Sequence, residues 1–274
     1  PFVTADTTLQ VADGLRGSII KCYYLDVRRL KRRLTFKGVD TILASLEKQL
    51  YNNIFIPGHR TEISTQEILK ALNNIRDILI YQHNGLFLHL VDSLINKVEI
   101  FGLHFASLDI RQESSVHNVV LEAIAEKTGV IPADYATMAV NEKMQMLCSV
   151  KSDVGSHVFE EGLVKDTLQT IKAIKEIQRY NGVAGCKRYI ISQCNSGLNV
   201  MEVFGLFMLS GWQREELNID IVPLFETIDD LKRAGAIMQE LYENDVYRQH
   251  LRKLGNRQTI MLGFSDGTKD GGYL

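Results

Sequence analysis

The segment Arg257-Gln-Thr-Ile-Met-Leu-Gly-Phe-Ser-Asp-Gly-Thr-Lys-Asp-Gly-Gly272 decides the fold that we predict for this chain of 274 residues. Residues 259–264 form an apolar run that is typical of a buried strand. The run then breaks into a glycine-rich turn over residues 265–272, which carries aspartate, lysine and hydroxyl side chains. In α/β enzymes, chemistry is placed in such turns, at the carboxyl ends of the strands. An ordinary surface loop is the competing interpretation.

Three more apolar runs lie upstream, at residues 103–110, 188–193 and 219–225. Helical patterns separate the four runs, as in parallel βαβ units. Before residue 98 the pattern is almost entirely helical, with helices predicted at 4–34 and 39–52 and from a capping box at Ser64-Thr-Gln-Glu67 onward. We therefore predict an α/β fold with a large excess of helix, divided into a helical segment (1–98) and a sheet-bearing segment (99–274). Four strands cannot close a barrel of about eight, so the sheet is open or further strands complete it.

Composition excludes several classes of function. The net charge of −2 and the pI near 6.4 give no electrostatic footprint for nucleic acid or an anionic membrane. The four cysteines lack metal-ligand spacing, which is typical of reduced thiols. No apolar run reaches the ~18 residues of a membrane span. We expect a soluble, cytoplasmic protein.

The chain starts at Pro1 and stops soon after a loop, and we interpret both ends as cut.

The predicted parallel sheet brings polar residues from three strands to one rim. Arg111, Glu226 and Asp266 come at the carboxyl ends of their strands, and Lys269 follows just beyond. Carboxylates suit a hard divalent cation, and arginine binds phosphate or carboxylate through two parallel hydrogen bonds. A structural network of arginine and carboxylates is the alternative.

The histidines predict no site. His104 is expected on a strand and His117 on a helix face, and we interpret both as structural. The other five are isolated, and the sequence shows no Ser–His–Asp arrangement.

Three segments resemble signatures of the phosphoenolpyruvate carboxylase family. They are Leu108-Asp-Ile-Arg-Gln-Glu-Ser-Ser-Val-His117, Val222-Pro-Leu-Phe-Glu-Thr-Ile-Asp-Asp-Leu231 and Met261-Leu-Gly-Phe-Ser-Asp-Gly-Thr-Lys-Asp-Gly271. Two shorter segments, Pro1-Phe-Val-Thr-Ala-Asp-Thr-Thr8 and Tyr189-Ile-Ile-Ser192, also resemble the family in the right order. Gly267-Thr268 and Gly271 depart slightly from the last signature. The family's Thr-x-His-Pro-Thr-Glu segment and Gly-Arg-Gly-Gly loop are absent.

This resemblance implies a central fragment of a lyase, with about half of a TIM-type (β/α)8 barrel plus extra helices. The implied reaction joins phosphoenolpyruvate and bicarbonate into oxaloacetate and phosphate, with Mg²⁺ or Mn²⁺. It would serve carbon dioxide fixation and the tricarboxylic acid cycle, in a homo-oligomeric (tetrameric) parent enzyme.

Carried over by residue, the resemblance implies that Glu226 and Asp266 bind the metal. Arg111 would bind substrate and act in catalysis on the phosphoryl group, with Lys269 as a second catalytic residue near the anionic ligands. We expect the chain to be inactive alone. Two alternatives stay open: a non-catalytic structural or interaction fragment of a larger chain, and a different metal-dependent barrel enzyme for phosphorylated enols.

Overall fold

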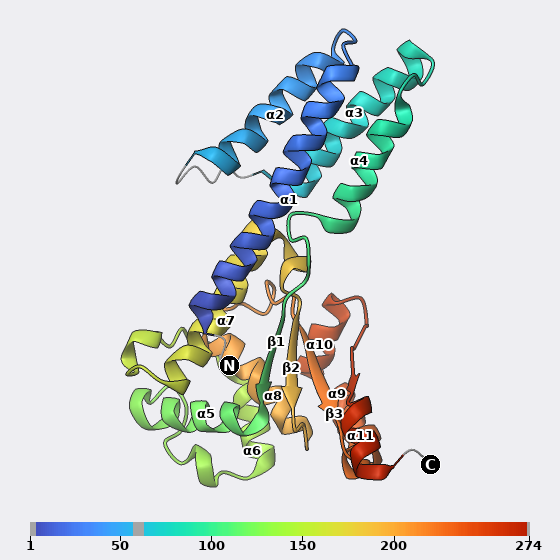
Figure 1. Cartoon of the computed structure of the whole chain (residues 1–274). Helices are drawn as coiled ribbons and strands as arrows, with labels where there is room; N and C mark the ends of the chain where they lie inside the picture. The colour runs from blue at the N-terminus through green and yellow to red at the C-terminus, as the bar shows by residue number, and fades with distance from the viewer. Residues whose placement is uncertain (1–3, 57–62, 273–274) are drawn as a thin grey trace. The chain divides into compact units, whose positions relative to one another are not determined.

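The computed structural model of the chain describes residues 4–56 and 63–272, without the side chains of residues 265–267 and 270 (Figure 1). The chain divides into two compact units. The helical unit comprises residues 7–107 and 176–185, and the sheet unit comprises residues 1–6, 108–175 and 186–274. Among the described residues, no helix is both long and apolar enough to cross a membrane.

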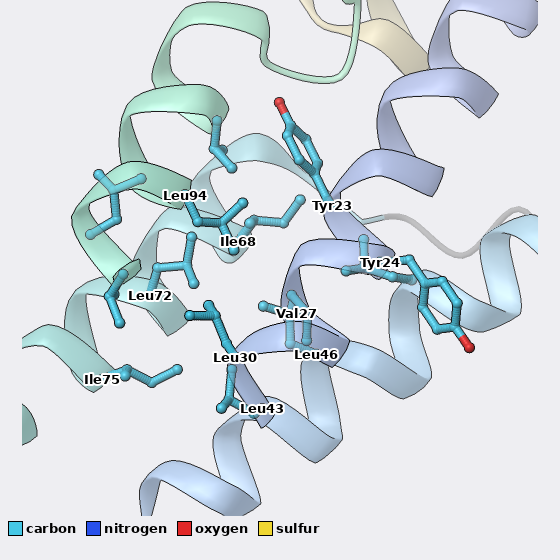
Figure 2. Packing of buried hydrophobic residues seen from close by; sticks show 14 of the residues in the cluster. Tyr23, Tyr24, Val27, Leu30, Leu43, Leu46, Ile68, Leu72, Ile75 and Leu94 are labelled. Atoms are coloured by element: carbon cyan, nitrogen blue, oxygen red, sulfur yellow. The ribbon is translucent and has the colours of Figure 1, made fainter. Parts of the chain in front are cut away.

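The helical unit is built from four helices around one apolar core. They are α1 (Ala5–Arg33), α2 (Val39–Phe55), α3 (Thr65–His83) and α4 (Leu88–Phe101), in agreement with the predicted helical run. Figure 2 shows side chains of this core, including Leu30 of α1, Leu43 of α2, Leu72 of α3 and Leu94 of α4. Burying each such side chain contributes roughly 1.5–3 kcal/mol. The apolar stripe of each helix therefore holds the unit together.

The capping box predicted at the start of α3 is confirmed. The backbone N–H of Glu67 donates to Oγ of Ser64 at 3.1 Å, and the N–H of Ser64 donates to the Glu67 carboxylate at 2.8 Å. These bonds satisfy two backbone donors that would otherwise have no partner inside the helix.

The sheet unit contains four parallel strands, as predicted. They are β1 (Asp109–Glu113), β2 (Arg188–Ser192), β3 (Asp220–Phe225) and β4 (Met261–Leu262), paired in the order β1-β2-β3-β4. Neighbouring strands are thus consecutive in the chain, with helices between them (Figure 1). This order is compatible with part of a β/α barrel. Within the described residues the sheet stays open at β1 and β4.

Among the described residues, seven helices follow β1 in the chain, and the last residues of one of them, α7, belong to the helical unit. They are α5 (Ser114–Thr128), α6 (Val140–Ser149), α7 (Leu163–Asn181), α8 (Gly197–Leu209), α9 (Ile228–Glu243), α10 (Asp245–Lys253) and α11 (Phe264–Gly271). On one face of the sheet, Nε2 of His117 in α5 lies 3.0 Å from the Tyr189 hydroxyl. The Tyr189 ring also meets Phe207 of α8 edge-on. Helices α5 and α8 therefore pack against this face of the sheet.

Helix α8 is buried almost throughout and carries one buried carboxylate, Glu202. Tyr135 donates to Glu202 at 3.0 Å, and the amides of Asn118 and Asn199 also donate to it. Burial raises the pKa of Glu202, although these hydrogen bonds act in the opposite direction. The network makes an acidic residue tolerable inside the core.

The prediction for the first strand was wrong in its position. The structure has a turn over residues 102–104, and β1 begins only at Asp109. Phe105 adopts a left-handed conformation with φ of 62°, and the N–H of Ala106 bonds back to the carbonyl of His104. Leu103, which suggested a strand, is instead buried in the core of the helical unit. The apolar pattern predicted correctly that Leu103 is buried, but it predicted the wrong backbone conformation for this segment.

The last strand and its turn also differ from prediction. Strand β4 has only two residues, and just before it Thr259 bonds through its N–H and its hydroxyl to the side-chain carboxylate of Asp220 in β3 rather than to the backbone of that strand. The predicted glycine-rich turn is helix α11, which Gly267 and Gly271 do not interrupt. Its opening pair, Ser265 and Asp266, consists of residue types that are favoured at a helix N-terminus.

Candidate functional site

The register of the strands defines the face of the sheet opposite α5 and α8. Arg111 pairs with Ile190, which in turn pairs with Val222, and paired residues project to the same face. On this face, Ile190, Val222 and Leu224 form a small buried apolar cluster. Arg111 lies in the middle of β1 rather than after its end, so the residue predicted to follow a strand in fact belongs to it.

Glu226 directly follows β3 on the same face, two residues beyond Leu224. Nη2 of Arg111 lies 3.0 Å from Oε1 of Glu226, forming an ion pair between β1 and the carboxyl end of β3. The Arg111 side chain is 54% exposed and that of Glu226 only 19%. The structure therefore brings two of the four predicted site residues, Arg111 and Glu226, together on the face opposite α5 and α8.

The backbone of Glu226 is fixed by the start of α9. The N–H groups of Glu226 and Thr227 both donate to Oδ2 of Asp230, at 3.3 and 3.0 Å, and the N–H of Asp230 donates to the Thr227 hydroxyl at 3.1 Å. These bonds form a capping box at the start of α9. Burial opposes the charged form of Asp230, but its hydrogen bonds hold the pKa below the usual value. Glu226 is thus part of a rigid junction between strand and helix.

Gly263 brings the end of β4 against Glu226. Its N–H donates to the carbonyl of Phe225 at 2.9 Å. A Cβ placed on Gly263 would lie 2.7 Å from Cγ and 3.2 Å from Cα of Glu226. Sequence reasoning did not single out this glycine, although a glycine inside an apolar strand run is a signal of close backbone approach.

The two remaining predicted residues belong to α11. Asp266 lies in its first turn, but its side chain is outside the described set, so its distance from Glu226 stays a prediction. Lys269 is exposed on the same helix. Gly271 lies close to Ile228 of α9, which places α11 beside the junction that holds Glu226.

The donor set at this junction fits a hard divalent cation. Carboxylate oxygen is the donor that Mg²⁺ and Mn²⁺ take from proteins, usually from one or two side chains, with water and substrate completing the shell. Glu226 provides one such carboxylate, and Asp266 is the residue type for the second. The described side chains contain no group of three or more His, Cys, Asp or Glu that could hold a metal.

The carboxyl end of β1 has two polar features that sequence reasoning missed. Glu113, in register with Ser192, accepts a hydrogen bond from Ser115 at 2.7 Å. The Ser114 hydroxyl donates to the carbonyl of Gln193 at 2.8 Å, where Gln193 has a φ of 53°. Glu113 is the last residue of β1 and Ser114 the first of α5, and the residue types alone gave no signal.

The buried histidines are not catalytic bases. Burial lowers the pKa of His117 to about 3 and that of His250 to about 4. His250 donates from Nε2 to the carbonyl of Ile219 at 2.9 Å. Both are structural, as predicted, whereas His104 lies in the turn before β1 and not on a strand.

Comparison with known proteins agrees with these motifs. The model of the phosphoenolpyruvate carboxylase family matches residues 43–274. A curated phosphoenolpyruvate carboxylase of Nitrosomonas eutropha is 33% identical over 73% of this chain and 22% of its own length. Proteins of the same name from Nitrosomonas europaea and Prochlorococcus marinus (strain MIT 9515) are 28% and 36% identical, over 100% and 67% of this chain and 34% and 20% of their own lengths. The chain thus spans about a third or less of these relatives.

Proposed function

The chain belongs to the phosphoenolpyruvate carboxylase family, and from this premise we propose that it supplies part of the active site of such an enzyme. The proposed reaction joins phosphoenolpyruvate and bicarbonate into oxaloacetate and phosphate. The observation that carries the proposal is the meeting of Arg111 and Glu226 on the face of a parallel sheet opposite α5 and α8, within two of the three family motifs. We extend it, on family grounds alone, to a cytoplasmic homo-oligomer built on a TIM-type barrel.

Arg111 is proposed to bind the phosphoryl group. A carbon–carbon bond forms between the methylene carbon of phosphoenolpyruvate and the carbon of bicarbonate. The bond between phosphorus and the enol oxygen breaks, so that this oxygen becomes the ketone of oxaloacetate. Phosphate leaves with one oxygen that came from bicarbonate. A guanidinium suits this transfer because its fork can hold two phosphoryl oxygens as charge moves between them.

The ion pair between Arg111 and Glu226 does not prevent this role. An exposed pair of this kind contributes only about 0–1 kcal/mol, because solvent screens it. Arg111 is more than half exposed, so exchanging the carboxylate for a phosphate dianion costs little.

Glu226 and Asp266 are proposed to hold Mg²⁺ or Mn²⁺. When bound, such an ion supplies positive charge that stabilises an enolate or phosphoryl oxygen. The capping box and Gly263 fix the Glu226 backbone, so its carboxylate is presented with little freedom. Lys269 is proposed to add a cation for the anionic ligands.

A second candidate is a non-catalytic interaction segment. The observation that favours it is the exposed end of the sheet, where Leu262 of β4 is 63% exposed and Phe264 is 84% exposed. Exposed apolar sheet edges of this kind commonly bind another protein segment. A piece of a larger enzyme would show the same feature, so activity must separate the two candidates.

The test is a carboxylation assay with ¹³C-bicarbonate, phosphoenolpyruvate and Mn²⁺, in which oxaloacetate is trapped as malate by malate dehydrogenase. It is run on the 274-residue chain and on a protein of the relatives' length that contains it. We expect label in a carboxyl group of malate, with equimolar phosphate, for the longer protein only. Phosphate release without label would contradict carboxylation. Turnover by the shorter chain near an ordinary ~10 s⁻¹ would show that the described residues suffice.

A further inference from the structure

The last six residues of α1, 28–33, include five cations, which face two different neighbours. On the side of α2, Arg28 and Lys31 both contact the carboxylate of Glu47, at 3.6 and 2.7 Å. On the side of α4, Arg29, Arg32 and Arg33 line a cleft. One carboxylate half-neutralises the two cations on the first side, and three further cations lie on the second side, where more positive charge accumulates.

The cleft has a volume of about 560 Å³ and is bounded by one stripe from each helix. Asp26, Arg29, Leu30 and Arg33 recur at helical spacing along α1, and Leu90, Ser93, Leu94 and Lys97 do so along α4. Leu30 and Leu94 are buried and form an apolar floor (Figure 2). The hydroxyl of Tyr23 donates to the carbonyl of Gly102, which ties α1 to the end of α4. The cleft is therefore built on packed helices.

The cations of the cleft are under-compensated. Asp26 alone contacts both Arg29, at 3.3 Å, and Lys97, at 2.8 Å. Arg32 and Arg33 have no ion pair or side-chain hydrogen bond with any described residue. Four cations against one carboxylate leave three positive charges in excess. Since the whole chain has a net charge of −2, this concentration is local.

We propose that this cleft binds a small organic anion carrying at least two negative charges as phosphate or carboxylate groups. The two uncompensated guanidiniums provide forks for oxyanions, and the leucine floor accepts a short carbon skeleton. The volume is within the ~300–1,000 Å³ of small-molecule sites. The acidic balance of the chain disfavours a nucleic acid partner. The site lies wholly in the helical unit, so it goes beyond the proposed carboxylation chemistry.

The experiment is isothermal titration calorimetry of the 274-residue chain with inorganic pyrophosphate and, separately, with citrate, at constant ionic strength. We expect saturable binding of one anion per chain. Binding of pyrophosphate alone would assign a phosphate ligand, and binding of citrate alone a polycarboxylate. The test variant is Arg32→Gln/Arg33→Gln, which we expect to raise Kd at least tenfold. The matched control is Arg28→Gln/Lys31→Gln, which removes two cations from the same turns on the α2 side and should change Kd less than twofold.

A second variant, Ser93→Asp, tests the cleft from α4. It adds a carboxylate to an exposed lining position and should also weaken binding, with an unchanged circular dichroism spectrum. Equal weakening by the two double variants would show diffuse attraction and overturn the proposal. Failure of both anions to bind, or a Kd insensitive to Arg32→Gln/Arg33→Gln and Ser93→Asp, would overturn it as well.

Discussion

Glu226 is held from three directions, and each contact comes from a different element. Asp230 of α9 accepts its backbone N–H, Arg111 of β1 pairs with its carboxylate, and Gly263 after β4 packs against its Cα and Cγ. Only Gly263 acts through the absence of a side chain. A methyl group there would have to displace the backbone of Glu226 or separate the ends of β3 and β4.

Gly263→Ala should therefore destabilise the sheet unit by about 1–3 kcal/mol through overpacking. Gly235→Ala is the matched control, because Gly235 is exposed within α9 and an added methyl group there would meet no neighbouring side chain. That change should instead stabilise the protein by up to about 1 kcal/mol, since alanine is the better helix former. Urea unfolding followed by circular dichroism measures both. Equal stabilisation by both changes would mean that β4 is not seated against Glu226.

At the scale of elements, the capping boxes at the starts of α3 and α9 can be compared directly. Those of α3 and α9 use the same bonds, but only the second also fixes the residue proposed to bind metal. A cap that does nothing else contributes helix stability, whereas a cap that also anchors a site contributes to function.

Thr227→Ala and Ser64→Ala should each lower stability by about 1 kcal/mol, the usual cost of losing such a cap. We expect only Thr227→Ala to lower oxaloacetate formation in a protein of the relatives' length, by several-fold. Thermal unfolding and the malate dehydrogenase-coupled assay give the two measurements. If Ser64→Ala reduced activity as much as Thr227→Ala, loss of stability rather than positioning would explain both.

Many of the helices and strands were predictable from the sequence, because helices and buried strands produce periodic patterns of apolar residues. The helices, both caps and the cores of β2 and β3 follow from the spacing of apolar residues and from local hydrogen-bonding side chains. The start of β1 was not predictable, because the apolar residue Leu103 packs in the core of the helical unit and does not belong to the sheet. The close approach of Gly263 to Glu226 depends on strand pairing between distant segments, which periodicity does not report.

At the scale of the whole molecule, the strands carry two ion pairs that differ in position and not in type. Arg111 pairs with Glu226 at the carboxyl end of β3, and Arg188 pairs with Asp109 at the amino ends of β2 and β1. Both arginines are about half exposed, 54% and 45%. In parallel α/β folds, chemistry lies at the carboxyl ends of the strands. We therefore expect the pair of Arg111 and Glu226 to have a functional role and the pair of Arg188 and Asp109 to have a structural one.

The most direct measurement is kcat/KM for phosphoenolpyruvate of Arg111→Lys and Arg188→Lys, made in a protein of the relatives' length that contains this chain. Lysine keeps the charge but loses the two-pronged hydrogen bonding, so Arg111→Lys should lower kcat/KM by about a hundredfold or more with little change in Tm. Arg188→Lys should leave it within twofold. Equal effects of the two substitutions, or an Arg111→Lys variant that loses stability and keeps its rate, would contradict the placement of the active site on this face.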